Sequence, residues 1–172
     1  MESKIFKSRR SLLFVPGNRL NLFSKALKTG ADVVCLDLED SIPSNQKAKT
    51  RKETIEFLKS TSEVKDTEIV VRINSLETHD GIRDIDYIMD SKTPPTSLML
   101  TKIRNAEEVC LLDKLLSTPV LSEIRFQVII ETNSALENVM RIATACGRID
   151  CLLFGGVDMA AELGTTFDWE SM

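Results

Sequence analysis

Six short apolar runs alternate along the chain with longer segments of mixed polar and apolar residues. The runs are rich in Val, Ile, Leu and Phe and show little alternation, which is typical of parallel β-strands covered on both faces. We therefore predict six strands. They are Ser11–Pro16, Val33–Leu38, Ile69–Ile73, Ser97–Leu100, Phe126–Ile130 and Cys151–Phe154.

Segments with the spacing of amphipathic helices lie between the apolar runs. The first places its apolar residues on one face and is followed by Gly30, a residue type that often ends a helix. His79, the only histidine, lies in a short polar segment and is interpreted as a solvated turn residue. The predicted helices are Leu20–Thr29, Gln46–Lys59, Ala106–Leu116 and Ser134–Ala145.

The repeated order of strand and helix predicts right-handed βαβ units and therefore an α/β protein with a parallel sheet. Such a sheet either stays open and doubly wound or closes into a (β/α)₈ barrel. No G-x-G-x-x-G follows the first strand, which argues against the dinucleotide-binding version of the open sheet. A TIM-type barrel needs about eight strands in about 250 residues. We expect one barrel domain over residues 1–172, with about six units present, which is either a fragment or a natively short protein.

Charged residues follow five of the predicted strands at their carboxyl ends, where a barrel has its catalytic mouth. This convergence is the main sign, from the residues alone, that the chain is an enzyme. The residues are Asp37, Glu39 and Asp40 after the second strand, Arg72 in the third, Lys102 after the fourth, Glu131 after the fifth and Asp158 after the sixth.

Glu131 and Asp158 are the candidate metal ligands, because they follow neighbouring strands. Adjacent strands lie about 4.8 Å apart, so carboxylates at their ends can share one ion. Two carboxylates, completed by water and substrate oxygens, are ligands that Mg²⁺ prefers. Helix N-caps or solvated loop acids would explain the same two positions.

Arg72 is the candidate for gripping a carboxylate or an oxyanion of a substrate, because its guanidinium can bind in a bidentate manner. An internal salt bridge with Asp37, Glu39 or Asp40 is the alternative, and both can hold at once. In an extended segment Asp37 and Glu39 share one face and Asp40 lies on the other. The three acids would orient Arg72 and Lys102.

Three further cations are candidates for binding anionic groups. Lys102 would neutralise a carboxylate or a phosphate, although a simple loop lysine is an equal alternative. Arg19 and Lys25 follow the first strand, near a predicted helix N-terminus, and suit a phosphate. Scattered surface cations would account for the same two residues.

Composition narrows the class of protein. A net charge of −4 provides no basic field for nucleic acid. No apolar stretch approaches the roughly 20 residues of a membrane span. The polar start of the chain lacks the apolar core of a signal peptide, which favours the cytoplasm. One histidine excludes a His-rich zinc site, and the four cysteines form no C-x-x-C pair.

Five motifs, in order and with compatible spacing, resemble the citrate lyase β-subunit-like family, which includes malyl-CoA, citramalyl-CoA and citryl-CoA lyases. The likeness runs through nearly the whole chain. The motifs are R-R-S-L-L-F-V-P-G-N (9–18), D-L-E-D-S-I (37–42), V-V-R-I-N-S-L (70–76), I-I-E-T (129–132) and G-G-V-D-M-A-A-E-L-G (155–164).

The resemblance implies a (β/α)₈ barrel that holds Mg²⁺ through Glu131 and Asp158 and binds an oxo acid through Arg72. It implies that Phe14, Arg19 and Lys25 contact a coenzyme A thioester, or a thioester on an acyl-carrier protein. The expected subunit assembly is a homo-oligomer, either a trimer or a hexamer. Relatives often have Pro-Lys where this chain has Thr101-Lys102. Several relatives also take an aspartate acid/base from a neighbouring subunit, in a C-terminal part that has no counterpart here.

The implied activity is carbon–carbon cleavage of a 3-hydroxyacyl thioester, or its formation in reverse. The products are an acyl thioester and a 2-oxo acid. Two alternatives remain open at this point: an acyl-CoA thioesterase on the same scaffold, and a non-catalytic shortened barrel that serves as an assembly subunit.

Overall fold

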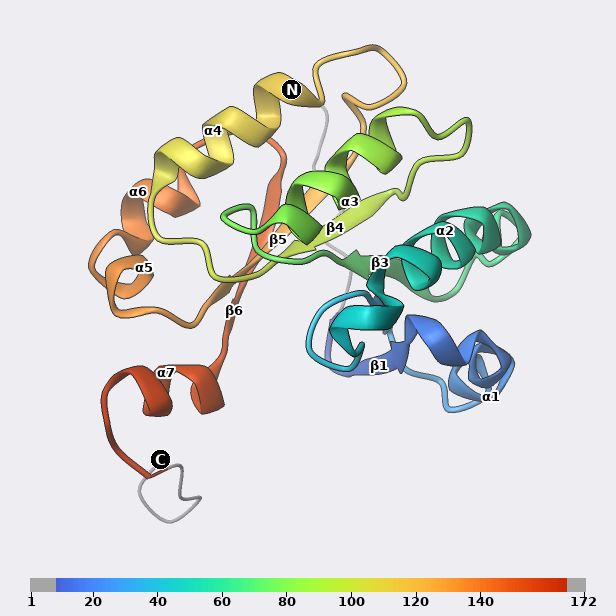
Figure 1. Cartoon of the computed structure of the whole chain (residues 1–172), viewed down its shortest axis with the longest axis horizontal. Helices are drawn as coiled ribbons and strands as arrows, with labels where there is room; N and C mark the ends of the chain where they lie inside the picture. Colours follow the sequence, from blue (N-terminus) through green and yellow to red (C-terminus); the bar gives the residue numbers. More distant parts are fainter. Residues whose placement is uncertain (1–8, 167–172) are drawn as a thin grey trace.

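The computed structural model describes residues 9–166. Its six strands form one parallel sheet in which every strand pairs with its neighbour in sequence (Figure 1). All six predicted strands are confirmed, with small shifts at their ends. They are β1 (Leu12–Pro16), β2 (Val33–Asp37), β3 (Glu68–Arg72), β4 (Ser97–Leu100), β5 (Arg125–Ile130) and β6 (Ile149–Phe154).

Helices connect successive strands and pack on one face of the sheet, while α7 follows the last strand and lies apart from this layer (Figure 1). Short 3₁₀ helices extend the first two of these connections. The helical elements are η1 (Gly17–Leu22), α1 (Phe23–Leu27), η2 (Ser44–Gln46), α2 (Lys47–Phe57), η3 (Leu58–Thr61), α3 (His79–Met89), α4 (Ala106–Leu115), α5 (Asn133–Glu137), α6 (Val139–Ala143) and α7 (Gly156–Glu162).

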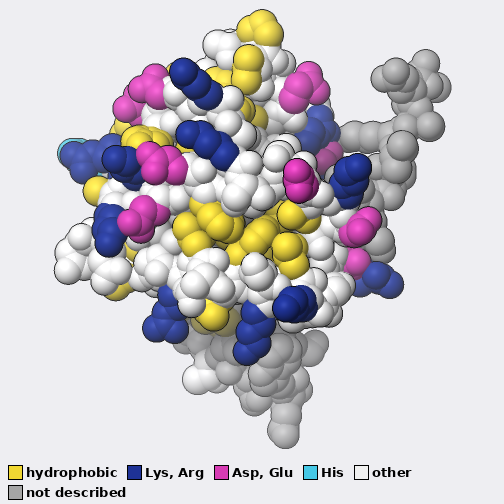
Figure 2. All heavy atoms as spheres, turned by 90° about the vertical axis from the view of Figure 1, so that its right-hand side faces the viewer, with side chains coloured by type: hydrophobic (Ala, Val, Ile, Leu, Met, Phe, Trp, Pro, Cys, Tyr) yellow, Lys and Arg dark blue, Asp and Glu magenta, His cyan; other side chains and the backbone are white. Residues whose placement is uncertain are grey.

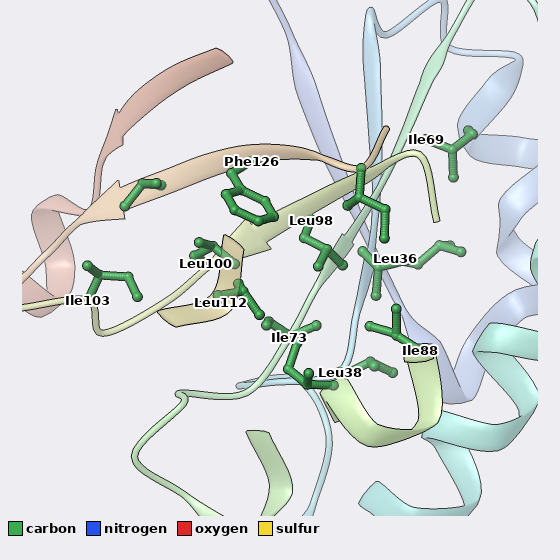
Figure 3. Close-up of a cluster of buried hydrophobic side chains, with 14 of the residues drawn as sticks. Leu36, Leu38, Ile69, Ile73, Ile88, Leu98, Leu100, Ile103, Leu112 and Phe126 are labelled. Carbon is green, nitrogen blue, oxygen red and sulfur yellow. The ribbon is translucent and has the colours of Figure 1, made fainter. Parts of the chain in front are cut away.

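The central strands β2 to β5 are buried on both faces, as their near-continuous apolar runs predicted. The larger hydrophobic cluster lies between the sheet and the helices, where Leu36, Leu98 and Phe126 are completely buried (Figure 3). A smaller cluster on the inner face contains Val33 and Met99. This two-sided burial fixes the register of the strands and therefore the positions of the residues at their carboxyl ends.

The helix predictions need three corrections. The interpretation of His79 as a turn residue was wrong, because His79 is the first residue of α3 and Thr78 caps that helix by accepting a hydrogen bond from the Gly81 N–H. The single helix predicted over residues 134–145 is two short helices that meet at Asn138. The helix predicted over residues 20–29 is shorter and begins as η1.

A polar network occupies the amino ends of the strands, opposite the predicted mouth. Arg9 Nε donates to Glu68 Oε2 at 2.7 Å, and Arg9 Nη2 donates to Asp150 Oδ2 at 3.3 Å. Gln127 Nε2 donates to Glu68 Oε1 at 2.9 Å. The network links the segment before β1 to β3, β5 and β6. It therefore connects the two edges of the sheet, at β1 and β6.

The outermost strands differ from the central ones in exposure. Every residue of β2 is buried, whereas Phe14 in β1 is 43% exposed and Phe154 in β6 is 64% exposed. The face seen in Figure 2 has a small apolar area surrounded by side chains of both charges. Within residues 9–166 no helix has the length and apolar character to cross a lipid bilayer.

Candidate active site

Asp37 and Arg72 form the centre of the site, because they are the last residues of neighbouring strands and stand opposite each other in the register of β2 and β3. Arg72 Nε donates to Asp37 Oδ1 and Arg72 Nη2 donates to Asp37 Oδ2, both at 2.7 Å. The Asp37 carboxylate is almost completely buried. This bidentate pair fixes the plane of the guanidinium and leaves Nη1 facing the mouth.

Glu39 and Asp40 contact the third nitrogen of the Arg72 guanidinium, Nη1. Nη1 lies 3.2 Å from Glu39 Oε2 and 3.3 Å from Asp40 Oδ2. The prediction that Asp40 lies on the opposite face from Glu39 was wrong, because the strand ends at Asp37 and the chain turns. Asp37 stabilises that turn by accepting hydrogen bonds from the N–H groups of Glu39 and Ser41, at 2.9 and 3.1 Å.

Phe14 joins this group from β1. The Arg72 guanidinium carbon lies 4.7 Å from the centre of the Phe14 ring, a cation–π contact. The internal salt bridge that was the alternative role for Arg72 is present, and it involves Asp37, Glu39 and Asp40. A partly exposed aromatic ring beside the arginine leaves an apolar wall at the mouth.

The charges around Arg72 are not balanced, since one guanidinium faces three carboxyl groups. Burial acts against ionisation of Asp37, but its hydrogen bonds with Arg72 outweigh that effect and lower its pKa. Burial raises the pKa of Glu39 to about 7, and the neighbouring Asp40 adds to the rise while Arg72 opposes it. The Glu39 carboxyl is consequently partly protonated near neutral pH.

Glu131, Lys102 and Asp158 form the second half of the site. The Lys102 N–H donates to Glu131 Oε1 at 2.7 Å, and Lys102 Nζ donates to Asp158 Oδ1. Lys102 has a φ of 54°, in the left-handed region that lysine seldom adopts. This conformation aims the backbone and the side chain of one residue at two carboxylates, and strained residues of this kind cluster at functional sites.

Glu131 differs from the helix cap or solvated loop acid that was the alternative, whereas for Asp158 that alternative stays open. Glu131 is 4% exposed, and the cap of α5 is its neighbour Thr132. Asp158 follows β6, as predicted, and lies in the first turn of α7 with its side chain 42% exposed. The two carboxylates nevertheless meet at Lys102, whose Nζ is 3.9 Å from Glu131 Oε1.

The pair presents two carboxylates to one cationic group, the Lys102 ammonium. Burial raises the pKa of Glu131, against the opposing effect of Lys102, so the carboxylate is incompletely compensated. Burial works to lower the pKa of Lys102, yet its hydrogen bond to Asp158 and the charge of Glu131 raise it overall. The ammonium thus stands where a cation is attracted. Within residues 9–166 no three His, Cys, Asp or Glu side chains gather around a metal position.

Gly155 makes room for the Glu131 carboxylate. A methyl group at Gly155 would lie 2.6 Å from Glu131 Cβ and 2.9 Å from Glu131 Oε2. Ordinary carbon contacts are about 3.5–4.0 Å. A side chain at residue 155 would therefore displace Glu131.

Two adjoining openings connect the halves of the site. One, of about 470 Å³, is lined by Lys102, Glu131 and Asp158 among others. The second, of about 420 Å³, is lined by Glu39, Asp40 and Lys102 among others. Lys102 belongs to both, so the metal candidates and the acidic loop beside Arg72 face a continuous mouth.

Arg19 and Lys25 are not part of this mouth. Arg19 lies in η1 and Lys25 in the last turn of α1, rather than at a helix N-terminus. Neither residue lines the two openings described above. Their assignment to a phosphate stays a prediction.

Sequence reasoning missed the polar residues behind the acidic loop, among them the half-buried Lys47 and the buried Asn74 and Asp84. Asn74 and Asp84 are buried at 5% and 0% exposure. The signal for Asn74 was its place two residues after Arg72. Asp84 gave no signal, because the helix that carries it was not predicted.

Comparison with known proteins identifies the chain. The family described as HpcH/HpaI aldolase/citrate lyase matches residues 10–171. The chain belongs to this family. This chain is 34% identical over 164 residues to the L-malyl-CoA/beta-methylmalyl-CoA lyase of Cereibacter sphaeroides (strain ATCC 17025). The match covers 92% of this chain and 51% of that protein. The chain is 28% identical over 177 residues to the mitochondrial citramalyl-CoA lyase of Homo sapiens, covering 95% and 52%. The chain spans about half the length of these curated relatives.

Solved structures of the family have the same fold. RipC from Yersinia pestis matches with a TM-score of 0.79 at 32% identity, over 96% of this chain and 66% of that one. The citrate lyase beta subunit of Mycobacterium tuberculosis, solved with oxaloacetate and magnesium, matches with a TM-score of 0.72 at 29% identity, over 92% and 65%. The predicted TIM-type barrel is thus confirmed, with six βα units in this chain.

Proposed function

We propose that this chain carries the active site of a Mg²⁺-dependent carbon–carbon lyase. Its substrate would be a 3-hydroxyacyl thioester, and its products an acyl thioester and a 2-oxo acid. The observation that carries the proposal is the pair of openings that share Lys102. Glu131 and Asp158 meet at Lys102 in one opening, and Glu39 and Asp40, which both contact Arg72, line the other. The names of the malyl-CoA and citramalyl-CoA lyases support the reaction class.

Glu131 and Asp158 are the proposed metal ligands. Related structures from Mycobacterium tuberculosis, solved with magnesium and oxaloacetate or pyruvate, support this choice of ion. Bound Mg²⁺ would supply Lewis-acid chemistry and a template for oxygen atoms. Lys102 would keep its backbone hydrogen bond to Glu131 and would move its ammonium away from Asp158.

Arg72 is the proposed catalytic and oxo-acid-binding residue. In the cleavage direction the 3-hydroxyl loses its proton, and the bond between the hydroxyl carbon and the carbon next to the thioester breaks. That electron pair passes to the thioester as an enolate, which then takes up a proton. Arg72 would stabilise the negative charge on the former hydroxyl oxygen through Nη1, because Asp37 already engages Nε and Nη2.

The remaining contacts complete the proposal. Phe14 would pack against the acyl thioester beside Arg72. Arg19 and Lys25 would hold phosphates of coenzyme A or of a carrier protein's phosphopantetheine. The enzyme would be a cytoplasmic homo-oligomer, a trimer or a hexamer, whose contacts cover exposed apolar residues of the outer strands such as Phe154.

Product analysis tests this function. The natural full-length protein is incubated with Mg²⁺ and L-malyl-CoA, and separately with citramalyl-CoA. A lyase releases glyoxylate with acetyl-CoA from the first, and pyruvate with acetyl-CoA from the second. Release of malate with free coenzyme A would assign thioester hydrolysis instead. Complete recovery of both substrates would overturn the proposed activity and favour an assembly role.

A further inference from the structure

Lys47, the first residue of α2, uses its whole hydrogen-bonding capacity on the loops behind the mouth. Its Nζ donates to the carbonyl oxygens of Leu38 and Glu39, at 3.2 and 3.0 Å, and to Asn74 Oδ1. An ammonium has three N–H groups, and three acceptors are present. Lys47 therefore has no donor left for a substrate, although it lies on the wall of the mouth beside Glu39.

Asn74 extends this contact into the interior. Its Nδ2 donates to the Leu38 carbonyl oxygen at 3.0 Å and to Asp84 Oδ2 at 2.7 Å, and its backbone N–H donates to the same Asp84 oxygen at 2.8 Å. Arg51 Nε donates to Asp84 Oδ1. A continuous polar chain thus runs from the loop after β2, through the end of β3, to α2 and α3.

These polar contacts hold both the backbone that carries Arg72 and the loop whose carboxyl groups face its guanidinium. Asn74 follows Arg72 by two residues, so it anchors the backbone that carries the guanidinium. Glu39 is held by Lys47 at its carbonyl oxygen and contacts Arg72 Nη1 through its carboxyl, at 3.2 Å. A rotation of this loop would move Glu39 and Asp40 relative to the arginine.

We propose that Lys47 is a positioning residue for Arg72, acting through the backbone of Leu38 and Glu39 and through Asn74. The inference rests on the proposed function, in which Arg72 binds the oxo acid. Lys47 touches neither Glu131 nor Asp158, which come from the β5 and β6 side of the mouth. Its removal should disturb oxo-acid binding and leave metal binding intact.

Calorimetry on the natural protein separates these two effects. Lys47→Met removes the charge and keeps the length of the side chain. Lys49→Met is the matched control, because Lys49 is on the same helix and its side chain is 78% exposed, with an ion pair to Glu53 at 3.7 Å. We expect Lys47→Met to weaken pyruvate binding about tenfold or more in saturating Mg²⁺ and to change Mg²⁺ affinity by less than about twofold. Lys49→Met should change neither. Equal weakening of both ligands, or of neither, would overturn the inference.

A double-mutant cycle with Arg72→Lys tests the route through Arg72, because residues that act through one another are not additive. Lys47→Met should add less than about twofold to the loss already caused by Arg72→Lys. Full additivity would mean that Lys47 acts on its own. If Lys47→Met does not fold, Lys47→Gln takes its place, with the same expected results.

The rate at which the Arg72 Nε–H exchanges with solvent can be measured by nitrogen-15 NMR. This rate distinguishes a failure of the positioning role of Lys47 from a failure of the proposed function. Lys47→Met should accelerate this exchange in the protein without ligand, because the loop that shields the arginine loosens. Unchanged exchange overturns the positioning role. If the parent protein binds no oxo acid but exchange still accelerates, the proposed function fails and the positioning of Arg72 stands.

Discussion

Gly155→Ala is the substitution whose effects on stability and on metal affinity can be estimated most directly from the structure. The new methyl group would lie 2.6 Å from Glu131 Cβ and 2.9 Å from both Glu131 Oε2 and Ile129 Cγ2. Carbon contacts are normally about 3.5–4.0 Å. The backbone that carries Gly155 or the backbone that carries Glu131 must therefore shift by about 1 Å. Overpacking of this kind costs about 1–3 kcal/mol. For a protein of this size, each kcal/mol lowers the Tm by about 2–4 °C.

The same shift should impair the metal site. Mg²⁺ requires ligand distances of about 2.0–2.1 Å in near-octahedral geometry, so a carboxylate displaced by even half an ångström is a poor ligand. We expect Mg²⁺ affinity to fall at least tenfold, which corresponds to about 1.4 kcal/mol. Calorimetric titration and thermal melts measure the two effects.

Gly147→Ala is the matched control for this test, because no atom lies within 4 Å of the added carbon. It should retain both Tm and affinity. If Gly155→Ala behaved like Gly147→Ala in both measurements, the contact between Gly155 and Glu131 would have no role in the site.

Three further predictions concern single side chains. Glu131→Gln keeps the size of the side chain but removes its charge, and calorimetry should show Mg²⁺ binding weakened at least tenfold; unchanged affinity would exclude Glu131 as a ligand. Arg72→Lys cannot supply the planar fork, so binding of pyruvate, glyoxylate and oxaloacetate should fall sharply with little loss of fold by circular dichroism. The pKa of Glu39 near 7 predicts that oxo-acid binding weakens as the pH rises through about 7, because the ionised carboxylate then competes for Arg72 and repels the ligand. Glu39→Gln should flatten this dependence, and an unaltered profile would assign it to another group.

The strands were predictable because each leaves a nearly continuous apolar run, and the central ones are buried on both faces, as in Val33–Asp37, where every residue is buried. α3 was missed for the opposite reason. Its start, Thr78–Gly81, is rich in residue types that also favour turns, and the capping role of Thr78 depends on its backbone conformation. α7 was missed because Gly155 and Gly156 open it, and glycine is a poor helix former.

The site was predictable in its members more than in its contacts. Parallel strands bring their carboxyl ends together, which is why Arg72 and Glu131 were found from the positions of the apolar runs alone. The sequence did not indicate that Lys102 adopts a left-handed conformation or that Asp40 turns toward Arg72. Both depend on loops whose geometry is set by tertiary contacts, such as the hydrogen bonds that Asp37 accepts.

The balance of charge in the mouth predicts an order of binding for the proposed lyase. Seven carboxyl groups and three cationic side chains line the two openings of the mouth, so it repels an anion even with Glu39 protonated. A divalent cation at Glu131 and Asp158 would reduce this excess before a negatively charged oxo acid approaches Arg72. Pyruvate should therefore bind measurably with Mg²⁺ present, and at least tenfold more weakly when a chelator removes it. Because coupling between two ligands is reciprocal, pyruvate should tighten Mg²⁺ binding by the same factor. Equal pyruvate affinity in the presence and absence of Mg²⁺, measured by calorimetry, would mean that Arg72 alone overcomes the surrounding acids and that the two halves of the mouth act independently.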